Sequence, residues 1–266
     1  MLYPELTDVH LFLGRAPHSN LARALSENGL NIHAGELTHH IVRPSAEISP
    51  YIDKLAQGAY SWVCITSPKT LGLINSECAH LQQALHNATQ QGTQFAAVGQ
   101  STKKSIEAYG IDVSLVATSP SSAAGLVQEF MKIEKNSIDN RPIFLPSSSI
   151  AAPLLHTQLG SMGWEVDNVP AYDTLPVDSL PHDIVHGLSQ INSGQERSFF
   201  LATAPSVARA FYDLTAQSYT NIPPALAIGT STYDTLRTEG FHVLFAFSRP
   251  DPSTICSELA SYLRSH

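Results

Sequence analysis

Short turns rich in threonine, serine and glycine are the segments of this sequence whose residue types are best suited to bind a ligand. Each turn follows a short apolar segment and precedes apolar residues at helical spacing, which places it at the carboxyl end of a strand. Backbone N–H groups at the start of a helix, together with the positive end of the helix dipole, bind carboxylates or phosphates without Lys or Arg. The candidate ligand-binding residues in these turns are Thr66, Ser67, Gly99, Ser101, Thr102, Thr203, Gly229, Ser231 and Thr232.

The hydroxyl groups in these turns have a second interpretation, because serine and threonine are also common N-cap residues. Proline is favoured in the first turn of a helix and would fit directly after such a cap. A turn that only caps a helix binds no ligand, but similar turns recur in both halves of the chain, which favours a shared ligand site. The expected capping pairs are Ser67 with Pro68, Ser101 with Thr102, and Ser231 with Thr232.

The sequence lacks the motifs of several common enzyme classes. It contains no G-x-x-x-x-G-K-[ST], G-x-G-x-x-G, G-x-S-x-G or H-E-x-x-H, which disfavours NTPases, dinucleotide dehydrogenases, serine hydrolases and zinc proteases. His182 and His186, with Asp183 beside them, have a spacing that could place two imidazoles on one helical face for a metal. The flanking proline and glycine favour a solvated connector instead. His39 and His40 receive the same interpretation, and we expect no metal site.

Charge and cysteine content narrow the possible partners and compartments. The 266 residues include 15 basic and 23 acidic side chains, a formal net charge of −8 at pH 7, which argues against a nucleic acid or an anionic membrane as partner. The three cysteines, Cys64, Cys78 and Cys256, form no C-x-x-C pair, which disfavours disulfides and thiolate metal sites. The N-terminus lacks a signal-like region and the apolar runs are short, so we expect a soluble, cytoplasmic protein.

The two halves of the chain repeat one another at an offset of roughly 130 residues, which indicates an internal duplication. In each repeat a short, uniformly apolar segment is followed by apolar residues at helical spacing, and residues 71–85 are expected to form one such helix. This pattern predicts an α/β fold with two doubly wound parallel sheets. Segments Thr38–Pro50 and Val169–His182 interrupt the pattern and are interpreted as inter-domain connections. The aligned segments are 98–113 with 228–243, 62–68 with 199–205 and, more weakly, 11–29 with 145–163.

Several of these segments resemble the uroporphyrinogen-III synthase family. Residues 65–71, Ile-Thr-Ser-Pro-Lys-Thr-Leu, are similar to that family's Thr-Ser-Pro-x-x-Val turn, and residues 97–106 are similar to its Ala-Val-Gly-x-x-Thr-Ala helix start. The resemblance extends from about Leu11 to Leu263, and the order and spacing of the motifs make it specific. Further similar segments are Val-Pro-Ala-Tyr at 169–172, Ala-Ile-Gly-Thr-Ser-Thr at 227–232 and Arg-Pro-Asp-Pro-Ser at 249–253.

The resemblance implies a fold of two flavodoxin-like domains joined by a two-strand connector. On this pattern domain 1 comprises residues 1–38 and 172–266, and domain 2 comprises residues 39–171. Both crossings then fall in the segments interpreted as connections.

The implied activity is cyclisation of hydroxymethylbilane to uroporphyrinogen III, with inversion of ring D and loss of water, in tetrapyrrole biosynthesis. The reaction needs no metal or organic cofactor, the partner is the small-molecule substrate, and the protein is expected to be a monomer. The alternative from another functional class is a two-domain binding protein that holds a small polycarboxylate without chemistry.

Two further site residues come from the resemblance. Tyr172 matches the tyrosine that the family places in its cleft, where a phenol could donate a proton to the leaving hydroxyl; packing is the alternative role. Arg15 matches the family's first-strand arginine region and could pair with a propionate; a surface arginine without function is the alternative. This sequence departs from the family at Pro146–Ser149, where relatives usually show a glycine and an arginine, and at Ala204, where they show a serine.

Overall fold

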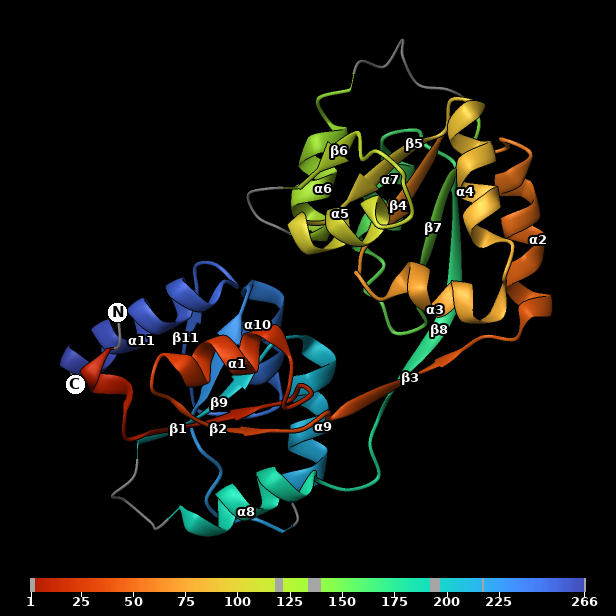
Figure 1. Ribbon diagram of the computed structural model, residues 1–266. Coiled ribbons are helices and arrows are strands. Elements are labelled where there is room, and N and C mark those ends of the chain that lie inside the picture. Colours follow the sequence, from red (N-terminus) through yellow and green to blue (C-terminus); the bar gives the residue numbers. More distant parts are fainter. Residues whose placement is uncertain (1–2, 118–121, 134–139, 192–196, 217, 266) are drawn as a thin grey trace. The chain divides into compact units, whose positions relative to one another are not determined.

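The computed structural model describes residues 3–117, 122–133, 140–191, 197–216 and 218–265, drawn as ribbons in Figure 1. The chain forms two compact units, one of residues 1–39 and 175–266 and the other of residues 40–174. The unit boundaries therefore lie at 39/40 and 174/175, whereas the sequence-based boundaries lie at 38/39 and 171/172. We call residues 1–39 with 175–266 unit 1 and residues 40–174 unit 2.

Unit 1 is built on a parallel sheet that has five strands among the described residues. Leu11 in the central strand lies opposite Ile32 on one side and Phe199 on the other, so three apolar segments distant in sequence share one layer. In chain order the strands take the positions 2-1-3-4-5, which is the flavodoxin-like arrangement. Across the sheet the strands are β2 (Asn31–Ala34), β1 (Val9–Leu13), β9 (Arg197–Ala202), β10 (Ala225–Ile228) and β11 (Val243–Phe247).

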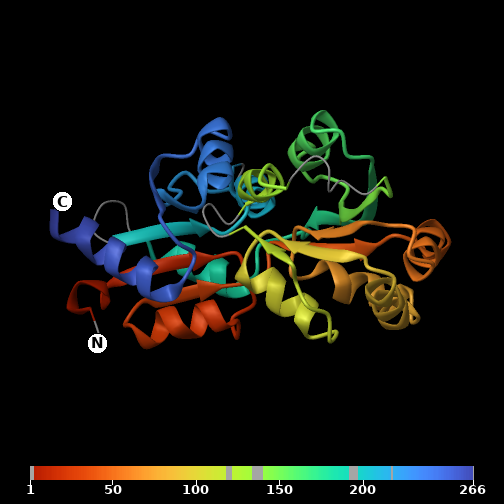
Figure 2. The same ribbon diagram turned by 90° about the horizontal axis from the view of Figure 1, so that it is seen from above.

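Helices cover both faces of the unit 1 sheet, as Figure 2 shows. On one face Leu25 and Leu259 pack with strand residues such as Leu11, and on the other face Ile184 and Phe211 pack with Phe12. Burial on both faces explains why the strands are uniformly apolar. The first face is covered by α1 (Asn20–Glu27) and α11 (Pro252–Ser265), with η1 (Pro4–Leu6) at its end, and the second face by α8 (His182–Gln190), α9 (Pro205–Thr215) and α10 (Thr230–Thr238).

Unit 2 contains a sheet that has six strands among the described residues. The Arg43 N–H donates to the Ala171 carbonyl, and the Val177 N–H donates to the Leu37 carbonyl, so β3 runs antiparallel to β8. The other recorded strand pairs are parallel. The strand order is β3 (Thr38–Val42), β8 (Val166–Pro176), β7 (Ile143–Ser148), β4 (Trp62–Ile65), β5 (Gln94–Ala97) and β6 (Leu115–Val116).

The unit 2 sheet also separates two apolar cores. Val63 and Ile65 of β4 face one core, while Trp62 and Cys64 face the other, as alternation along a strand requires. The first core is covered by α2 (Ser45–Ala56), α3 (Thr70–Glu77), α4 (Leu81–Gln90) and α5 (Gln100–Glu107), and the second by α6 (Ala123–Phe130) and α7 (Leu154–Ser161).

The structure confirms the predicted α/β class with a parallel sheet in each unit, to which β3 adds one antiparallel edge strand in unit 2. The segments that align in sequence also occupy matching sheet positions, because β4, β5 and β6 neighbour one another in the same order as β9, β10 and β11. A common origin of the two units by duplication stays a prediction. No helix among the described residues is long and apolar enough to cross a membrane.

One local prediction is wrong. Residues 71–85 form two helices rather than one, because Cys78 has φ −121° and ψ 83° and ends α3. The apolar spacing continues through the break because both helices bury their apolar residues in the same core. Each segment interpreted as an inter-domain connection contains a boundary between the two units, but regular elements form much of both. The segment Thr38–Pro50 contains β3 and the first half of α2, with Pro50 inside the helix. Likewise, Val169–Pro176 belongs to strand β8.

Candidate active site

The Thr66–Ser67 turn follows β4 in unit 2, and both residues are half-buried. The Ser67 hydroxyl accepts a hydrogen bond from the backbone N–H of Lys69 at 3.3 Å, so the serine stabilises the turn. The predicted cap at Ser67 and Pro68 is wrong, because α3 begins only at Thr70 with Lys69 as the N-cap. Pro68 therefore belongs to the turn that leads into the helix.

Glycine, rather than serine or threonine, caps the two helices that follow the aligned Gly-containing turns. Gly99 precedes α5 and Gly229 precedes α10, so the predicted caps at Ser101–Thr102 and Ser231–Thr232 are wrong. Gly229 has φ +80°, a left-handed conformation that is unfavourable for residues with a Cβ. A glycine cap leaves the first backbone N–H groups of the helix without a side-chain acceptor, which keeps them available to an anion.

The hydroxyl residues that follow these caps face in two directions. Ser101 and Ser231 are exposed, so their hydroxyl groups are accessible to a ligand. Thr102 and Thr232 are each only 2% exposed and pack inward in the first helical turn. The threonines therefore support the turns from below, while the serines and the backbone N–H groups form the accessible surface.

Within each unit the predicted residues lie at the end of the sheet where the parallel strands terminate. In unit 2 they follow the carboxyl ends of β4 and β5 or, for Tyr172, lie opposite the last residue of β7, and in unit 1 they follow β1, β9 and β10. Because these strands are parallel, their carboxyl ends lie together at the same end of the sheet. The set in unit 2 is Thr66, Ser67, Gly99, Ser101, Thr102 and Tyr172, and the set in unit 1 is Arg15, Thr203, Gly229, Ser231 and Thr232.

Tyr172 lies in the unit 2 core and is 4% exposed. Its hydroxyl oxygen is 3.5 Å from the hydroxyl of the buried Thr70. The pairing register of β8 shifts at this point, so that one additional residue, Ala171, stands between the residues paired with Ser147 and Ser148. This bulge explains why the consecutive residues Ala171 and Tyr172 are both buried, since a bulge redirects the side chains that follow it.

A chain of polar side chains begins beside the Tyr172 ring. His40 on β3 meets that ring edge-on, with centroids 5.5 Å apart. The His40 Nδ1 atom is 3.2 Å from the Thr174 hydroxyl, which is 3.0 Å from the Ser148 hydroxyl. On the other side of the imidazole, the Nε2 atom is 3.0 Å from the Lys69 ammonium nitrogen. His40 is therefore more than a solvated connector residue, which corrects the sequence-based interpretation.

A second polar group lies next to this chain. Asp173 accepts hydrogen bonds from the Ser149 hydroxyl and from the Arg43 guanidinium, the latter at 2.8 Å. The Ser149 hydrogen bond and the positive charge of Arg43 hold the pKa of Asp173 below its ordinary value. Two serines of the segment that departs from the family pattern, Ser148 and Ser149, thus hold Thr174 and Asp173 of the neighbouring strand.

Arg15 follows β1 in unit 1 and is exposed. Its Nε atom lies 3.4 Å from the Thr203 hydroxyl, so the structure brings together these two predicted residues. Desolvation of the guanidinium lowers the pKa of Arg15, but an arginine stays protonated in proteins. The side chain therefore offers a positive charge beside the turn that follows β9.

The histidines first considered for a metal lie in α8. His182 and His186 stack with centroids 6.4 Å apart, and Asp183 accepts the Ala34 N–H at 2.8 Å, so this carboxylate stabilises the packing of α8 on β2. Across the part of the chain that the structure describes, no group of three or more histidine, cysteine or acidic side chains is arranged to hold a metal.

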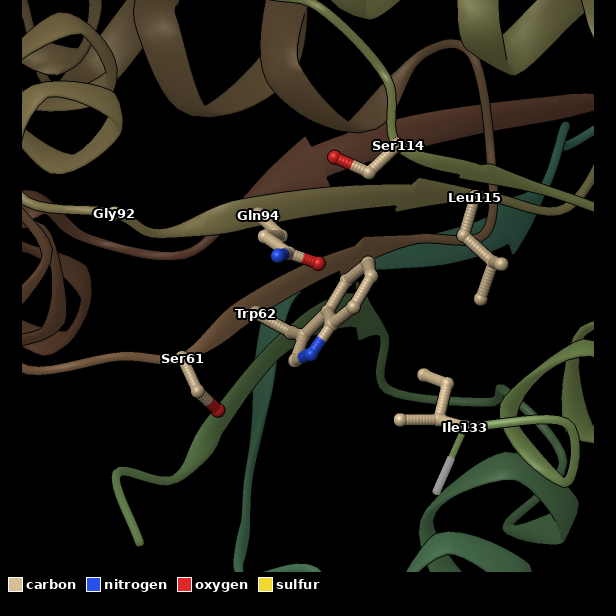
Figure 3. A pocket seen from close by; sticks show the side chains of 7 residues that line it. All are labelled: Ser61, Trp62, Gly92, Gln94, Ser114, Leu115 and Ile133. Carbon is tan, nitrogen blue, oxygen red and sulfur yellow. The ribbon is translucent and has the colours of Figure 1, made fainter. Parts of the chain in front are cut away.

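A hollow of about 330 Å³ lies at the amino-terminal end of the strands of the unit 2 sheet, as Figure 3 shows. It is lined by Trp62, Gln94 and Leu115, the first residues of β4, β5 and β6. These are the amino ends of the strands, so the hollow is separate from the turns described above.

The residues that sequence reasoning missed act through contacts between distant segments. Lys69 and His40 are 29 positions apart, and Arg43 and Asp173 are 130 positions apart. The His39–His40 pair and the run of serines at 147–149 were visible as unusual features, but no local pattern connects them to Lys69 or Thr174.

Comparison with known proteins places these features in a family. Residues 19–256 match the family model described as uroporphyrinogen-III synthase HemD. A mutant uroporphyrinogen III synthase from Thermus thermophilus is 16% identical, with a TM-score of 0.59 and coverage of 97% of this chain and 100% of that one. The uroporphyrinogen-III synthetase from Helicobacter pylori is also 16% identical, with a TM-score of 0.57 and coverage of 96% and 99%. At this identity the structural likeness supports the fold. No curated protein sequence matches the chain significantly.

Proposed function

The chain belongs to the uroporphyrinogen-III synthase family, which cyclises hydroxymethylbilane in tetrapyrrole biosynthesis, and from this premise we propose how its own residues take part. The substrate is an open-chain tetrapyrrole with many carboxylates. The pyrrole nitrogen pushes out the hydroxymethyl oxygen as water and leaves an azafulvene cation. The terminal ring attacks at its substituted carbon to form a spiro intermediate, which fragments and closes again with ring D inverted.

The main task of the protein in this reaction is to hold a flexible substrate in one geometry, because the substrate also closes unaided to the uninverted isomer. We assign the binding of its carboxylates to the strand-end turns. The two glycine caps, Gly99 and Gly229, support this assignment. They leave the N–H groups at the start of two helices without a competing side-chain acceptor. The exposed hydroxyls of Ser101 and Ser231 add donors beside those N–H groups.

The remaining turn residues complete this assignment. Ser67 stabilises the turn after β4, and the half-buried Thr66 precedes it there. The buried Thr102 and Thr232 support the first turns of two helices, and Arg15 with Thr203 offers a cation and a hydroxyl in unit 1.

Tyr172 is the proposed proton donor to the leaving hydroxyl. Tyr172 lies opposite the last residue of β7, and its phenol contacts Thr70 in the described conformation. Donation to substrate requires that the phenol exchange this contact for the leaving oxygen. The neutral hydroxyl partner makes that exchange less costly than breaking an ion pair.

The alternative of a binding protein without chemistry is not favoured, because the family model covers residues 19–256. The net charge of −8 supports a small-molecule partner over a nucleic acid. Action as a monomer in the cytoplasm belongs to the same proposal.

The experiment that tests this function supplies freshly made hydroxymethylbilane and measures the isomer ratio after oxidation of the products to porphyrins. We expect isomer III to dominate with the protein and isomer I without it. Products that stay almost wholly isomer I in the presence of the protein would refute the function.

A further inference from the structure

The contact between Lys69 and His40 determines which nitrogen of the His40 ring carries the hydrogen. An ammonium group can only donate, so the His40 Nε2 atom, 3.0 Å away, must accept, and the imidazole must be neutral with its hydrogen on Nδ1. That hydrogen is donated to the Thr174 hydroxyl, which shares a further hydrogen bond with the Ser148 hydroxyl. The two hydrogen bonds of His40 therefore run in one direction, from Lys69 to His40 and from His40 to Thr174.

This chain gives a flexible cation a defined position. Thr174 and Ser148 lie on the paired strands β8 and β7, and the edge-on contact with Tyr172 limits the rotation of the His40 ring. Lys69 itself is exposed, and its contact with His40 uses one of the three donors of the ammonium group. The lysine side chain is thus already ordered in the folded protein, so ligand binding does not have to include the entropic cost of ordering it.

The position of Lys69 connects this cation to the binding turns. Lys69 is the last residue of the turn that follows β4, and its backbone N–H is held by Ser67. The Lys69 and Thr70 N–H groups already donate to Ser67, so a carboxylate at this turn would meet the positive end of the α3 dipole and a positioned positive charge. This combination differs from the turns at Gly99 and Gly229, where the helix-start N–H groups lie beside the exposed hydroxyls of Ser101 and Ser231.

We propose that Lys69 binds a carboxylate of the substrate and that His40 is a positioning residue that acts through Lys69. The inference rests on the proposed function, since it names a binding residue for the same substrate. It also gives unit 2 a side-chain cation at a binding turn, as Arg15 does in unit 1.

The test measures kcat, KM and isomer ratio with hydroxymethylbilane for substitutions at the two positions. Lys69→Gln should raise KM by about tenfold, as expected for loss of a charged hydrogen bond, with kcat and isomer ratio close to wild type. His40→Leu should raise KM in the same direction. His40→Gln, whose amide oxygen can accept from Lys69 as Nε2 does, should restore most of the affinity. Equilibrium binding of uroporphyrinogen III should follow the same order.

Two comparisons separate positioning from general damage. The double variant with Lys69→Gln and His40→Leu should be no weaker than Lys69→Gln alone, because His40 acts only through the ammonium. Lys54→Gln removes the same charge from a lysine that lies 3.7 Å from Asp167 near the amino end of β8, and should leave KM unchanged. Thermal unfolding of every variant shows whether a loss of substrate affinity comes from a loss of folding stability.

The outcomes distinguish this inference from the proposed function. If the wild-type protein yields isomer III and the KM of Lys69→Gln is within twofold of wild type, the binding role of Lys69 is overturned. The proposed function stands in that case. Additive losses in the double variant overturn the positioning role of His40. Wild-type protein that yields only isomer I refutes the proposed function, and the inference falls with it.

Discussion

At the scale of single residues, Tyr172 combines a proposed chemical role with burial in a core. Its ring packs among apolar side chains while its hydroxyl meets Thr70. Tyr172→Phe removes one oxygen and keeps the ring, so we expect the protein to stay folded and the rate to fall by about 10²-fold, a magnitude typical of general acid catalysis. The residual product should remain mainly isomer III, because the binding turns determine how the substrate folds.

The control for Tyr172→Phe is Thr70→Val, which removes the other partner of the same contact and leaves the phenol in place. Rate and isomer ratio should be measured for both variants together with thermal unfolding. Full activity in Tyr172→Phe would show that Tyr172 has only a packing role. A switch to isomer I at normal stability would show that Tyr172 shapes the substrate instead of protonating it.

His33 makes the stability of unit 1 depend on pH. It is 9% exposed, stacks on Phe12, and its Nε2 atom lies 2.9 Å from Nδ1 of His10. Desolvation lowers the pKa of His33, the charge of Asp183 opposes this shift, and His10 and His186 reinforce it. The folded protein therefore binds fewer protons at this site than the unfolded chain, and the free energy of unfolding should decrease as pH falls below roughly 6.5.

Urea unfolding of wild type and His33→Gln at pH 7.5 and pH 5.5 checks this sign. The variant should lose less stability between the two pH values than wild type does, because the other titrating groups are common to both. An equal pH dependence in the two proteins would contradict a depressed pKa at His33.

At the scale of elements, one glycine controls how closely α8 approaches the unit 1 sheet. A Cβ atom at Gly187 would lie 2.5 Å from the His33 ring and 2.8 Å from Phe12. Both neighbours are rings held by stacking, so the helix would have to move. We expect Gly187→Ala to lower the free energy of unfolding by about 1–3 kcal/mol, although alanine is the better helix former.

The matched control is Gly160→Ala in α7, where a Cβ atom would meet nothing within 4 Å. That substitution should raise the free energy of unfolding by about 0.5–1 kcal/mol, since it only removes the entropic cost of glycine in a helix. Denaturant unfolding of both variants gives the comparison, and stabilisation by Gly187→Ala would show that α8 can shift without loss.

At the scale of the whole molecule, unit 2 is a continuous stretch of chain with its own two cores. Unit 1 is assembled from two separate segments, because β1 lies between β2 and the distant β9. We expect a fragment of residues 40–174 to fold by itself with one cooperative transition, and a fragment of residues 1–39 to remain unfolded. Circular dichroism and thermal unfolding of the two fragments test this. Absence of a cooperative transition in the 40–174 fragment would show that unit 2 depends on the rest of the chain.

Local patterns were sufficient for the fold class and for the family. Short apolar segments such as residues 62–65, followed by a turn and a helix-like spacing, predicted parallel α/β sheets because strand and helix periodicity depend on near neighbours. The Thr-Ser-Pro and Ala-Val-Gly turns carried the resemblance for the same reason. Helix starts were predicted less well, because serine and threonine are frequent caps and the sequence does not reveal that glycine takes this position at residues 99 and 229.

Only the tertiary structure decided how the site residues face one another. The bulge at Ala171, which turns Tyr172 into the core, depends on the pairing of β8 with β7 and has no local signature. The alignment of Lys69, His40, Thr174 and Ser148 requires three strands and a turn to meet. Such contacts form between segments far apart in the chain, so the spacing of residues along the sequence contains the types of side chain that the site uses but not their partners.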